Sequence, residues 1–231
     1  MKLNRHPQNI VDPDSWKQVC PPKKGDIQWR DGRSAKELAK YMTKCLPAIP
    51  TEIEQALEKI ASPISQFDWD AEYVTALPGK GEGRNHDAIL YNDDIVITIE
   101  AKADETLGNL IDEEIQNASV NKLNRISKLL EYIFGGGFKE YHGLRYQLLT
   151  AAVGTLLEVE HQNKEDGKHI KTAVMLVLVF KTNGDVTEEK IASNHKDIEN
   201  FLEATNAYDE NGLKVIPNNT GTKLYFKEIV L

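Results

Sequence analysis

Apolar and polar positions alternate most regularly between residues 67 and 102 of the chain. In the segment 67–76, aromatic or small apolar residues take turns with acidic ones, which is typical of a half-buried strand. Two further apolar or β-branched runs, 88–90 and 95–99, flank the turn-forming sequence Asn92-Asp93-Asp94. The pattern therefore predicts one strand followed by a β-hairpin.

Apolar residues recur at helical spacing on both sides of this region. Ser34 and Glu37 form a capping-box pattern, so a helix is expected over residues 35–44 with Ser34 as its N-cap. The other segments with a helical pattern are 51–61, stripes between 110 and 133, 144–160, and a segment ending near residue 204. The run 173–180 is apolar throughout and predicts a central strand buried on both faces, and 223–230 predicts a last strand.

These elements predict a single α/β domain in which helices flank a central mixed β-sheet. Residues 1–50 form an N-terminal helical cap, residues 51–181 the core, and residues 182–231 a C-terminal extension with a helix and a strand. The first 33 residues have no regular pattern, and Trp16 and Trp29 are expected to anchor them by burying their rings.

The charge of the chain restricts the kinds of partner that it can bind. The chain has 231 residues and a net charge of −8, which argues against a protein that coats nucleic acid through one large basic surface. Between residues 117 and 147 the balance reverses, and this segment is either a phosphate-facing strip or a solvated helix face. Its charged residues are Lys122, Arg125, Lys128, Lys139 and Arg145 against Glu131 and Glu140.

Segments that target a protein to a membrane or to secretion are not visible. No run of 18 apolar residues occurs, so no membrane span and no membrane partner are expected. The first residues lack an apolar signal segment. Cys20 and Cys45 are not in metal-ligand spacing. We therefore expect a cytoplasmic protein with two reduced thiols.

The predicted hairpin contains the strongest candidates for functional residues. A two-residue loop at Asp93-Asp94 would place Asp87 opposite Glu100, whereas a four-residue loop would place it diagonally on the same face. Glu100 and Lys102 share one face because side chains alternate along a strand. Both registers therefore bring Asp87, Glu100 and Lys102 together.

Two acids and an amine at the end of an apolar strand pair must be solvated, paired or bound to a metal ion. Asp87, Glu100 and the carbonyl of Ala101 could bind Mg²⁺ or Mn²⁺, since hard cations prefer oxygen ligands. Lys102 would then orient or deprotonate a water molecule, or stabilise charge on a phosphate. The alternative is a cross-strand salt bridge at a sheet edge.

Asp87, twelve intervening residues and then Glu100-Ala101-Lys102 resemble the D…(D/E)-x-K signature of the PD-(D/E)XK, or restriction-endonuclease-like, nuclease superfamily. His86 stands where the Pro of the motif is expected. The order of predicted elements over about residues 51–181 also fits that superfamily, with a helix, three antiparallel strands, a helix and a further strand. The resemblance implies a restriction-endonuclease-like core.

The resemblance also implies further site residues. Glu52 or Glu54, in the helix before the first strand, would supply an additional acid, although first-turn glutamates facing the helix dipole explain them equally well. Gln147, and after it Arg145, would approach the metal-bound phosphate.

The glycine-rich loop 78–84 carries two more candidates for binding the substrate, Lys80 and Arg84. The loop is not a P-loop, because no Gly-Lys-Ser/Thr element and no helix follow it.

The function expected from these residues is Mg²⁺-dependent hydrolysis of nucleic-acid phosphodiesters, more in keeping with DNA than RNA, with Asp87, Glu100, Lys102 and Gln147 as catalytic residues. One alternative is a binding or assembly module on the same fold in which the acids are structural. Another is a phosphodiesterase for a small phosphate substrate. The sequence is compatible with a homodimer.

Overall fold

The computed structural model describes residues 2–5 (backbone only), 10–23, 25–60, 66–116, 118–135, 141, 143–181 and 188–231. Lys139 and Glu140 of the predicted basic segment lie outside these residues, as does the segment 182–187 before the last helix.

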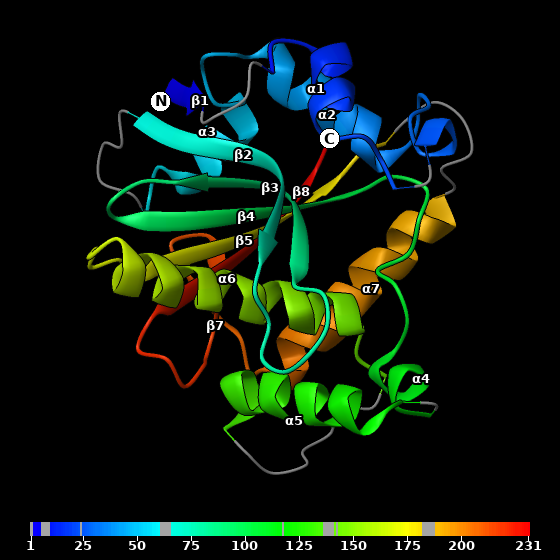
Figure 1. Ribbon diagram of the computed structural model, residues 1–231, viewed down its shortest axis with the longest axis vertical. Helices are drawn as coiled ribbons and strands as arrows, with labels where there is room; N and C mark the ends of the chain where they lie inside the picture. The colour runs from blue at the N-terminus through cyan, green and yellow to red at the C-terminus, as the bar shows by residue number, and fades with distance from the viewer. Residues whose placement is uncertain are drawn as a thin grey trace.

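A mixed eight-stranded sheet forms the centre of this part of the protein (Figure 1). In spatial order its strands are β1 (Lys2–Arg5), β2 (Gln66–Thr75), β3 (Arg84–Tyr91), β4 (Ile95–Lys102), β5 (Thr172–Val179), β8 (Lys223–Val230), β7 (Leu213–Ile216) and β6 (Tyr208–Glu210). The predicted hairpin β3–β4 is antiparallel, and β5 lies parallel to both β4 and β8. The predicted α/β class with a mixed sheet is confirmed.

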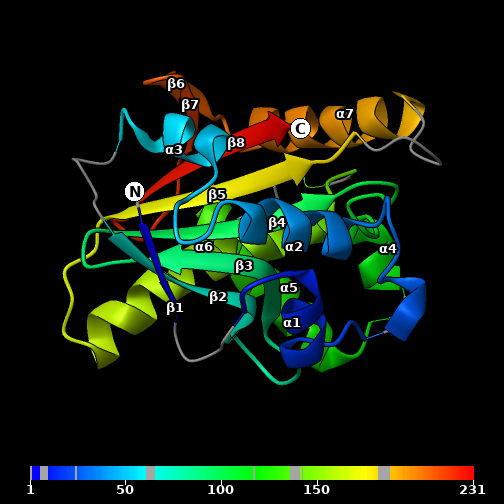
Figure 2. The same ribbon diagram turned by 90° about the horizontal axis from the view of Figure 1, so that it is seen from above.

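Helices cover both faces of the sheet (Figures 1 and 2). The first face is covered by α1 (Pro13–Val19), α2 (Ser34–Lys44) and α3 (Thr51–Leu57). The second is covered by α4 (Ile111–Gln116), α5 (Val120–Phe134), α6 (Tyr146–Glu165) and α7 (Glu188–Ala204). Ile97 and Ile99 of β4 belong to the first core and Val96 to the second, as strand alternation requires.

The centre of the sheet is buried on both sides. In β5 every residue except Thr172 is buried, which confirms the prediction of a central strand. All of β4 is buried as well, including the charged residues Glu100 and Lys102. Charged side chains are rarely found inside a protein unless they are paired, so this end of β4 needs a specific explanation.

The pairing of β2 with β3 is interrupted at one position next to that end of β4. Ala71 pairs with Ala88 and Tyr73 with His86, but Glu72 between them has a left-handed backbone with φ of 51°. Ala71 packs in the first core, whereas Tyr73 packs against the second. The expected regular alternation over 67–76 is therefore wrong beyond Ala71, because the side chains change faces of the sheet at the left-handed residue Glu72.

The pairing of β3 with β4 ends at the same level of the sheet. Paired residues run from Tyr91–Val96 to Ala88–Ile99, yet β3 begins four residues earlier at Arg84. In Figure 1 the ends of β2 and β3 curve away from β4 and cross in front of α6. The sheet thus opens a fork between β3 and β4, with Asp87 and Glu100 at its start.

Three further expectations were incomplete or wrong. The first 33 residues contain α1 and β1, although Trp16 and Trp29 are buried as predicted. The helix over 35–44 is confirmed as α2, but its N-cap is Arg33, because Ser34 turns its hydroxyl to Glu105 instead. The short β6–β7 hairpin was not anticipated.

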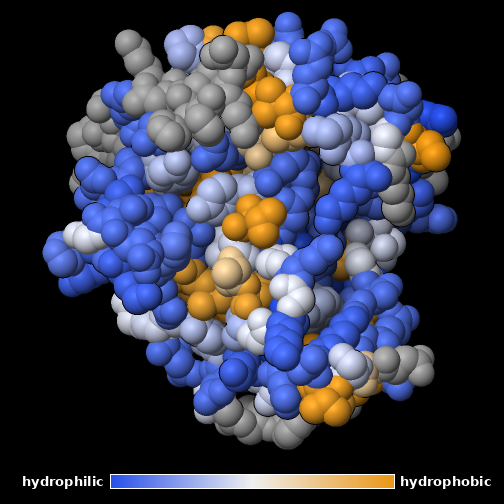
Figure 3. Space-filling view, in the orientation of Figure 1, coloured by the Kyte–Doolittle hydropathy of each residue, from blue (hydrophilic) through white to orange (hydrophobic). Residues whose placement is uncertain are grey.

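The surface holds no extended apolar area on the face shown in Figure 3, where small hydrophobic patches lie separated by hydrophilic residues. Among the described residues, no helix is long and apolar enough to cross a membrane. Cys20 and Cys45 do not form a disulfide with each other.

Candidate functional site

The hairpin turn sets the register of the site. Asn92 N donates to Ile95 O at 3.1 Å, and the Asn92 side chain accepts from Asp94 N at 2.8 Å, so Asp93-Asp94 is a two-residue loop. Tyr91 consequently pairs with Val96. Counting along this register puts Asp87 opposite Glu100, one step beyond the last paired residues, as the shorter of the two predicted loops requires.

Asp87 marks the start of the fork. Its Oδ2 accepts a hydrogen bond from the backbone N of Ala101 at 2.7 Å. An Asp side chain thus takes the amide hydrogen of the neighbouring strand at the point where backbone pairing stops. Asp87 is partly exposed, while Glu100 and Lys102 are only 3% and 4% exposed.

Donors from three elements surround Glu100. Lys102 Nζ lies 2.6 Å from Oε1, which also accepts from Gln147 Nε2 at the start of α6. Arg84 of β3 forms an ion pair with Oε2 through its Nη2. Two cations and an amide therefore hold one buried carboxylate, and the arrangement fixes the orientation of all four side chains.

The pKa values in this cluster diverge for electrostatic reasons. Burial acts to raise the pKa of Glu100, but the charges of Arg84 and Lys102 outweigh it and the pKa falls. Burial and the charge of Glu100 raise the pKa of Asp87 well above its usual range. Burial acts to lower the pKa of Lys102, but the charges of Glu100 and Asp87 outweigh it and raise the pKa. Two neighbouring acids with opposite shifts are typical of functional sites.

Glu72 is a member of the cluster that the sequence interpretation missed. It lies in β2 opposite Asp87, and its Oε2 accepts from Asn85 Nδ2. Burial raises the pKa of Glu72, and the charge of Glu100 adds to the rise. The only signal in the sequence is its place in the acidic half of segment 67–76, which by itself indicates a solvent-facing side chain.

The donor set suits a small hard cation. Asp87 and Glu100 offer carboxylate oxygens, and Mg²⁺ commonly uses one or two protein carboxylates together with water and phosphate oxygens. Within the described part of the chain, no group of three or more His, Cys, Asp and Glu residues is arranged to hold a metal ion.

His86 lies beside this cluster in the position that the signature gives to Pro. Its ring is 1% exposed, and its Nε2 has no hydrogen-bond partner among the described residues. Burial and the charge of Arg84 lower the pKa of His86 to about 3, so the ring is neutral. A Cβ on Gly154 of α6 would lie 2.9 Å from Nε2, which shows how closely the helix approaches β3 here.

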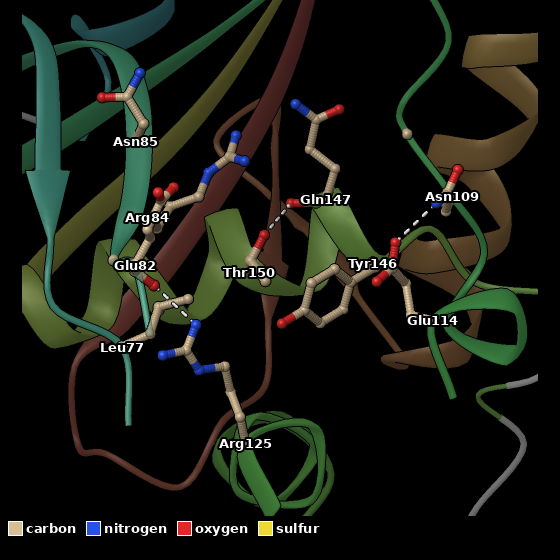
Figure 4. A pocket seen from close by; sticks show the side chains of 12 residues that line it. Leu77, Glu82, Arg84, Asn85, Asn109, Glu114, Arg125, Tyr146, Gln147 and Thr150 are labelled. Carbon is tan, nitrogen blue, oxygen red and sulfur yellow. Dashed lines mark hydrogen bonds between the residues drawn. The ribbon is translucent and has the colours of Figure 1, made fainter. Parts of the chain in front are cut away.

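A cavity of about 520 Å³ opens beside the acids, between β3, α5, α6 and the segment around Gly108 (Figure 4). Arg84, Asn85 and Gln147 line it, and each of them also bonds to Glu100 or Glu72. The acid cluster therefore lies directly behind this wall of the cavity, within one side chain of any molecule bound there.

Comparison with known proteins gives a family without a described activity. The profile of one family, described as Domain of unknown function (DUF6946), matches residues 9–230. The chain belongs to that family. Neither a curated protein nor a solved structure matches the chain.

The structure brings four of the predicted site residues together, namely Asp87, Glu100, Lys102 and Gln147. Arg84 joins them, but as the first residue of β3 and a partner of Glu100 rather than as part of a loop. Lys80 is exposed in the loop before β3. Ala101 contributes its amide hydrogen to Asp87, and its carbonyl remains a predicted ligand.

Three other candidates lie away from the acids. Glu52 and Glu54 belong to α3, whose Ile53 packs in the core on the opposite face of the sheet from Glu100, and Glu52 accepts from Tyr41 Oη at 2.9 Å. Arg145 binds Asp197 of α7 at 2.8 Å and the carbonyl of Gly108 at 2.8 Å. Since these contacts use its guanidinium, Arg145 connects α6 to its neighbours.

The predicted basic segment is not one continuous strip. Lys122 forms an ion pair with Glu114, and Arg125 hydrogen-bonds the carbonyls of Pro78 and Glu82 at 3.2 Å and 2.8 Å. Lys128 is exposed on α5. Of these residues, Arg125 lines the cavity, so this part of the segment faces the site.

Proposed function

We propose that this protein is a Mg²⁺-dependent nuclease that hydrolyses phosphodiester bonds, with a restriction-endonuclease-like core. The observation that carries the proposal is the buried pair Glu100 and Lys102 with the half-buried Asp87 at a fork in the sheet, next to a cavity that reaches the surface. The pairing of β2, β3 and β4 with β5, and the crossover through α6, support the proposed core.

Asp87 and Glu100 would hold the ion. When bound, the ion supplies positive charge to a phosphate oxygen and makes a bound water more acidic. Its charge would also offset the burial and the repulsion from Glu100 that raise the pKa of Asp87. The two carboxylates thus have a reason to lie together that a salt bridge alone does not give them.

The surrounding residues have separate tasks in this proposal. Lys102, held as an ammonium ion by Glu100 at 2.6 Å, stabilises negative charge that develops on the phosphate. Arg84 and Gln147 fix the Glu100 carboxylate. In the hydrolysis, the oxygen of water bonds to phosphorus and the water releases one proton to the solvent; the bond to the leaving oxygen breaks, and that oxygen takes up one proton from the solvent.

Cleavage assays with a matched pair of variants test this proposal. Asp87→Asn keeps the shape and can still accept from Ala101 N, whereas Asp94→Asn changes an exposed acid in the hairpin turn. With Mg²⁺ or Mn²⁺ present, we expect Asp87→Asn to cleave at least about 100-fold more slowly than the wild type, and Asp94→Asn to be unaffected. Single-stranded, double-stranded and branched DNA, and RNA, are the substrates.

Cleavage by Lys102→Met is a second test of the same site. A urea-unfolding curve establishes that this variant folds. We expect a comparable loss of rate in the folded variant. If wild-type protein cuts none of these substrates with either ion, or if Asp87→Asn and Lys102→Met cut at the wild-type rate, the proposed function is wrong.

A further inference from the structure

We propose that the cavity beside the acids receives one unpaired nucleoside phosphate unit, with its phosphate near Arg84 and Arg125 and its base against Tyr146. The ligand is defined by this chemistry, and it can come from a single strand or from a free nucleotide. The inference rests on the proposed function and names the substrate class for the same site.

The size of the cavity limits which ligands it can hold. Its volume of about 520 Å³ lies within the range of pockets that enclose small ligands. In a duplex the bases are stacked and paired, and enzymes that take a base into a pocket must first remove it from the stack. A nucleotide that is already unpaired enters such a cavity without that cost.

Two arginines supply the charge for a phosphate. Arg84 lies on the wall next to the acids, and Arg125 reaches into the cavity from α5 (Figure 4). The Nε and Nη1 atoms of Arg125 hold the carbonyls of Pro78 and Glu82, whereas its Nη2 is buried and has no hydrogen-bond partner within the described ranges. A planar guanidinium with a free N–H is well suited to a phosphate oxygen.

The loop that contains Gly81 packs closely against the Arg125 guanidinium. Gly81 has a φ of 121°, and a Cβ at this position would lie 3.0 Å from Nη2 of Arg125. A side chain there would both strain the backbone and push the guanidinium aside. The glycine therefore keeps the loop in contact with Arg125 while leaving room at the cavity.

An aromatic ring also lines the cavity. Tyr146, the first residue of α6, is partly exposed and lines the cavity. Lys122 Nζ lies 5.9 Å from its ring centroid, so the ring is fixed by a cation–π contact. Proteins that bind unpaired nucleotides commonly stack their bases on such rings.

Side-chain amides complete the lining. Asn85, Asn109 and Gln147 each donate one N–H to a carboxylate, of Glu72, Glu114 and Glu100 respectively. An amide that donates one N–H retains a second N–H and a carbonyl oxygen, and these match the donors and acceptors along the edge of an unpaired base.

The two acids that line the cavity do not dominate its charge. Glu114 forms an ion pair with Lys122, and Glu82 lies 3.5 Å from Lys23 at the surface. Beside these acids the cavity presents Arg125, the amides, the tyrosine ring and Arg84, whose Nη2 is paired with Glu100.

Fluorescence anisotropy without metal ion tests the inference, since EDTA prevents the proposed cleavage. The probes are a short fluorescein-labelled DNA single strand and the duplex of the same sequence, and deoxyadenosine monophosphate is the competitor. We expect the single strand to bind at least about tenfold more tightly than the duplex. Tyr146→Leu should weaken single-strand binding by about tenfold, in keeping with the loss of one stacked base.

Two controls accompany this variant. Tyr146→Phe retains the ring and should bind like the wild type, and Lys128→Gln removes an exposed charge of α5 that does not line the cavity. If the mononucleotide binds as tightly as the single strand, the free nucleotide is the ligand; if it binds at least about tenfold more weakly, the strand is.

Equal binding of duplex and single strand, or unchanged binding by folded Tyr146→Leu, would overturn the inference even if metal-dependent cleavage is found. Conversely, the expected binding without any cleavage of a polymer would retain the cavity as a nucleoside phosphate site and reject the proposed nuclease.

Discussion

Glu100 and Glu158 are two glutamates buried between the sheet and α6, yet their surroundings differ. Glu158, which is 1% exposed, accepts from Tyr73 Oη at 2.9 Å and from Thr75 Oγ1 and Gln162 Nε2, each at 3.1 Å. All of these donors are neutral. Lys168 hydrogen-bonds Gln162 rather than the carboxylate.

Glu100 instead has two cations and an amide around it and two more acids, Asp87 and Glu72, within range of its charge. A buried acid needs hydrogen bonds, and Glu158 has them without any further charged group. The additional acids beside Glu100 increase the electrostatic cost of the folded state, and they are the reason to assign a function to that cluster and not to the other.

The largest effect on stability is expected at Glu158. Glu158→Ala leaves the donors of Tyr73, Thr75 and Gln162 without their acceptor, so the free energy of unfolding should fall by about 3 kcal/mol. Asp87→Asn should leave it within about 1 kcal/mol of the wild type or raise it, because the substitution removes a repelled carboxylate and retains an acceptor for Ala101 N.

Urea unfolding at neutral pH with EDTA measures both changes. A loss in Asp87→Asn as large as that in Glu158→Ala would show that Asp87 is a structural cap of the hairpin, and the contrast between the two clusters would disappear.

A smaller effect is expected at Gly154, which lies on α6 between Gln147 and Glu158. Alanine in a helix is normally more stable than glycine by about 1 kcal/mol. At this position, however, the new Cβ would lie 2.9 Å from His86 Nε2 and 3.1 Å from Arg84 Cγ. We expect Gly154→Ala to destabilise the protein by about 1–3 kcal/mol, since overpacking forces both side chains to move.

Urea unfolding of Gly154→Ala, His86→Ala and the double variant forms a thermodynamic cycle. The double variant should lose less than the sum of the single losses, because the ring that meets the new methyl group is gone. Additive losses would mean that α6 and β3 are not in close contact beside Arg84.

The smallest effect concerns Glu228, a third glutamate at the same level of the sheet as Glu100. Val177 of β5 pairs with both residues, and Glu228 Oε2 lies 2.6 Å from His195 Nδ1 at the surface. The hydrogen bond with Glu228 raises the pKa of His195. The folded state therefore binds the proton of His195 more tightly than the unfolded state does.

This stabilisation is fully present below the unfolded pKa, near 6.5, and is lost as the pH rises through the raised pKa of the folded protein. The contribution should stay below about 1 kcal/mol, because the half-exposed ring is screened by solvent. Comparing urea unfolding of wild type and His195→Gln across this pH range measures it. A difference that does not vary with pH would show that the pair contributes no charge-dependent stability.

Local patterns in the sequence predicted much of the frame around these clusters. The apolar run 173–180 agrees with β5, the alternating and β-branched segments with β2, β3 and β4, and the helical stripe at 144–160 with α6. Asn92-Asp93-Asp94 predicted the hairpin loop, and its shorter register led directly to the meeting of Asp87 with Glu100. Each of these signals depends on neighbours within a few residues.

Other features depend on contacts between distant parts of the chain. The left-handed backbone of Glu72 occurs where β2 and β3 curve across α6, and neither its position nor the change of faces that follows it can be predicted from an alternating segment. Ser34 has the pattern of an N-cap but bonds to Glu105, and Arg145 stands near Gln147 in sequence yet binds Asp197. In each case several partners are chemically suitable, and the fold selects one of them.

The sequence by itself therefore determined the strands, the main helices and the set of Asp87, Glu100 and Lys102, because side-chain periodicity and turn chemistry are local. Only the tertiary structure decided that Arg84 pairs with Glu100 and that Glu72 joins this set, that Glu52 and Glu54 lie on the other face, and that a cavity opens beside it. Those outcomes depend on how strands diverge and on which helix covers which face of the sheet, and both are set by packing across the whole domain.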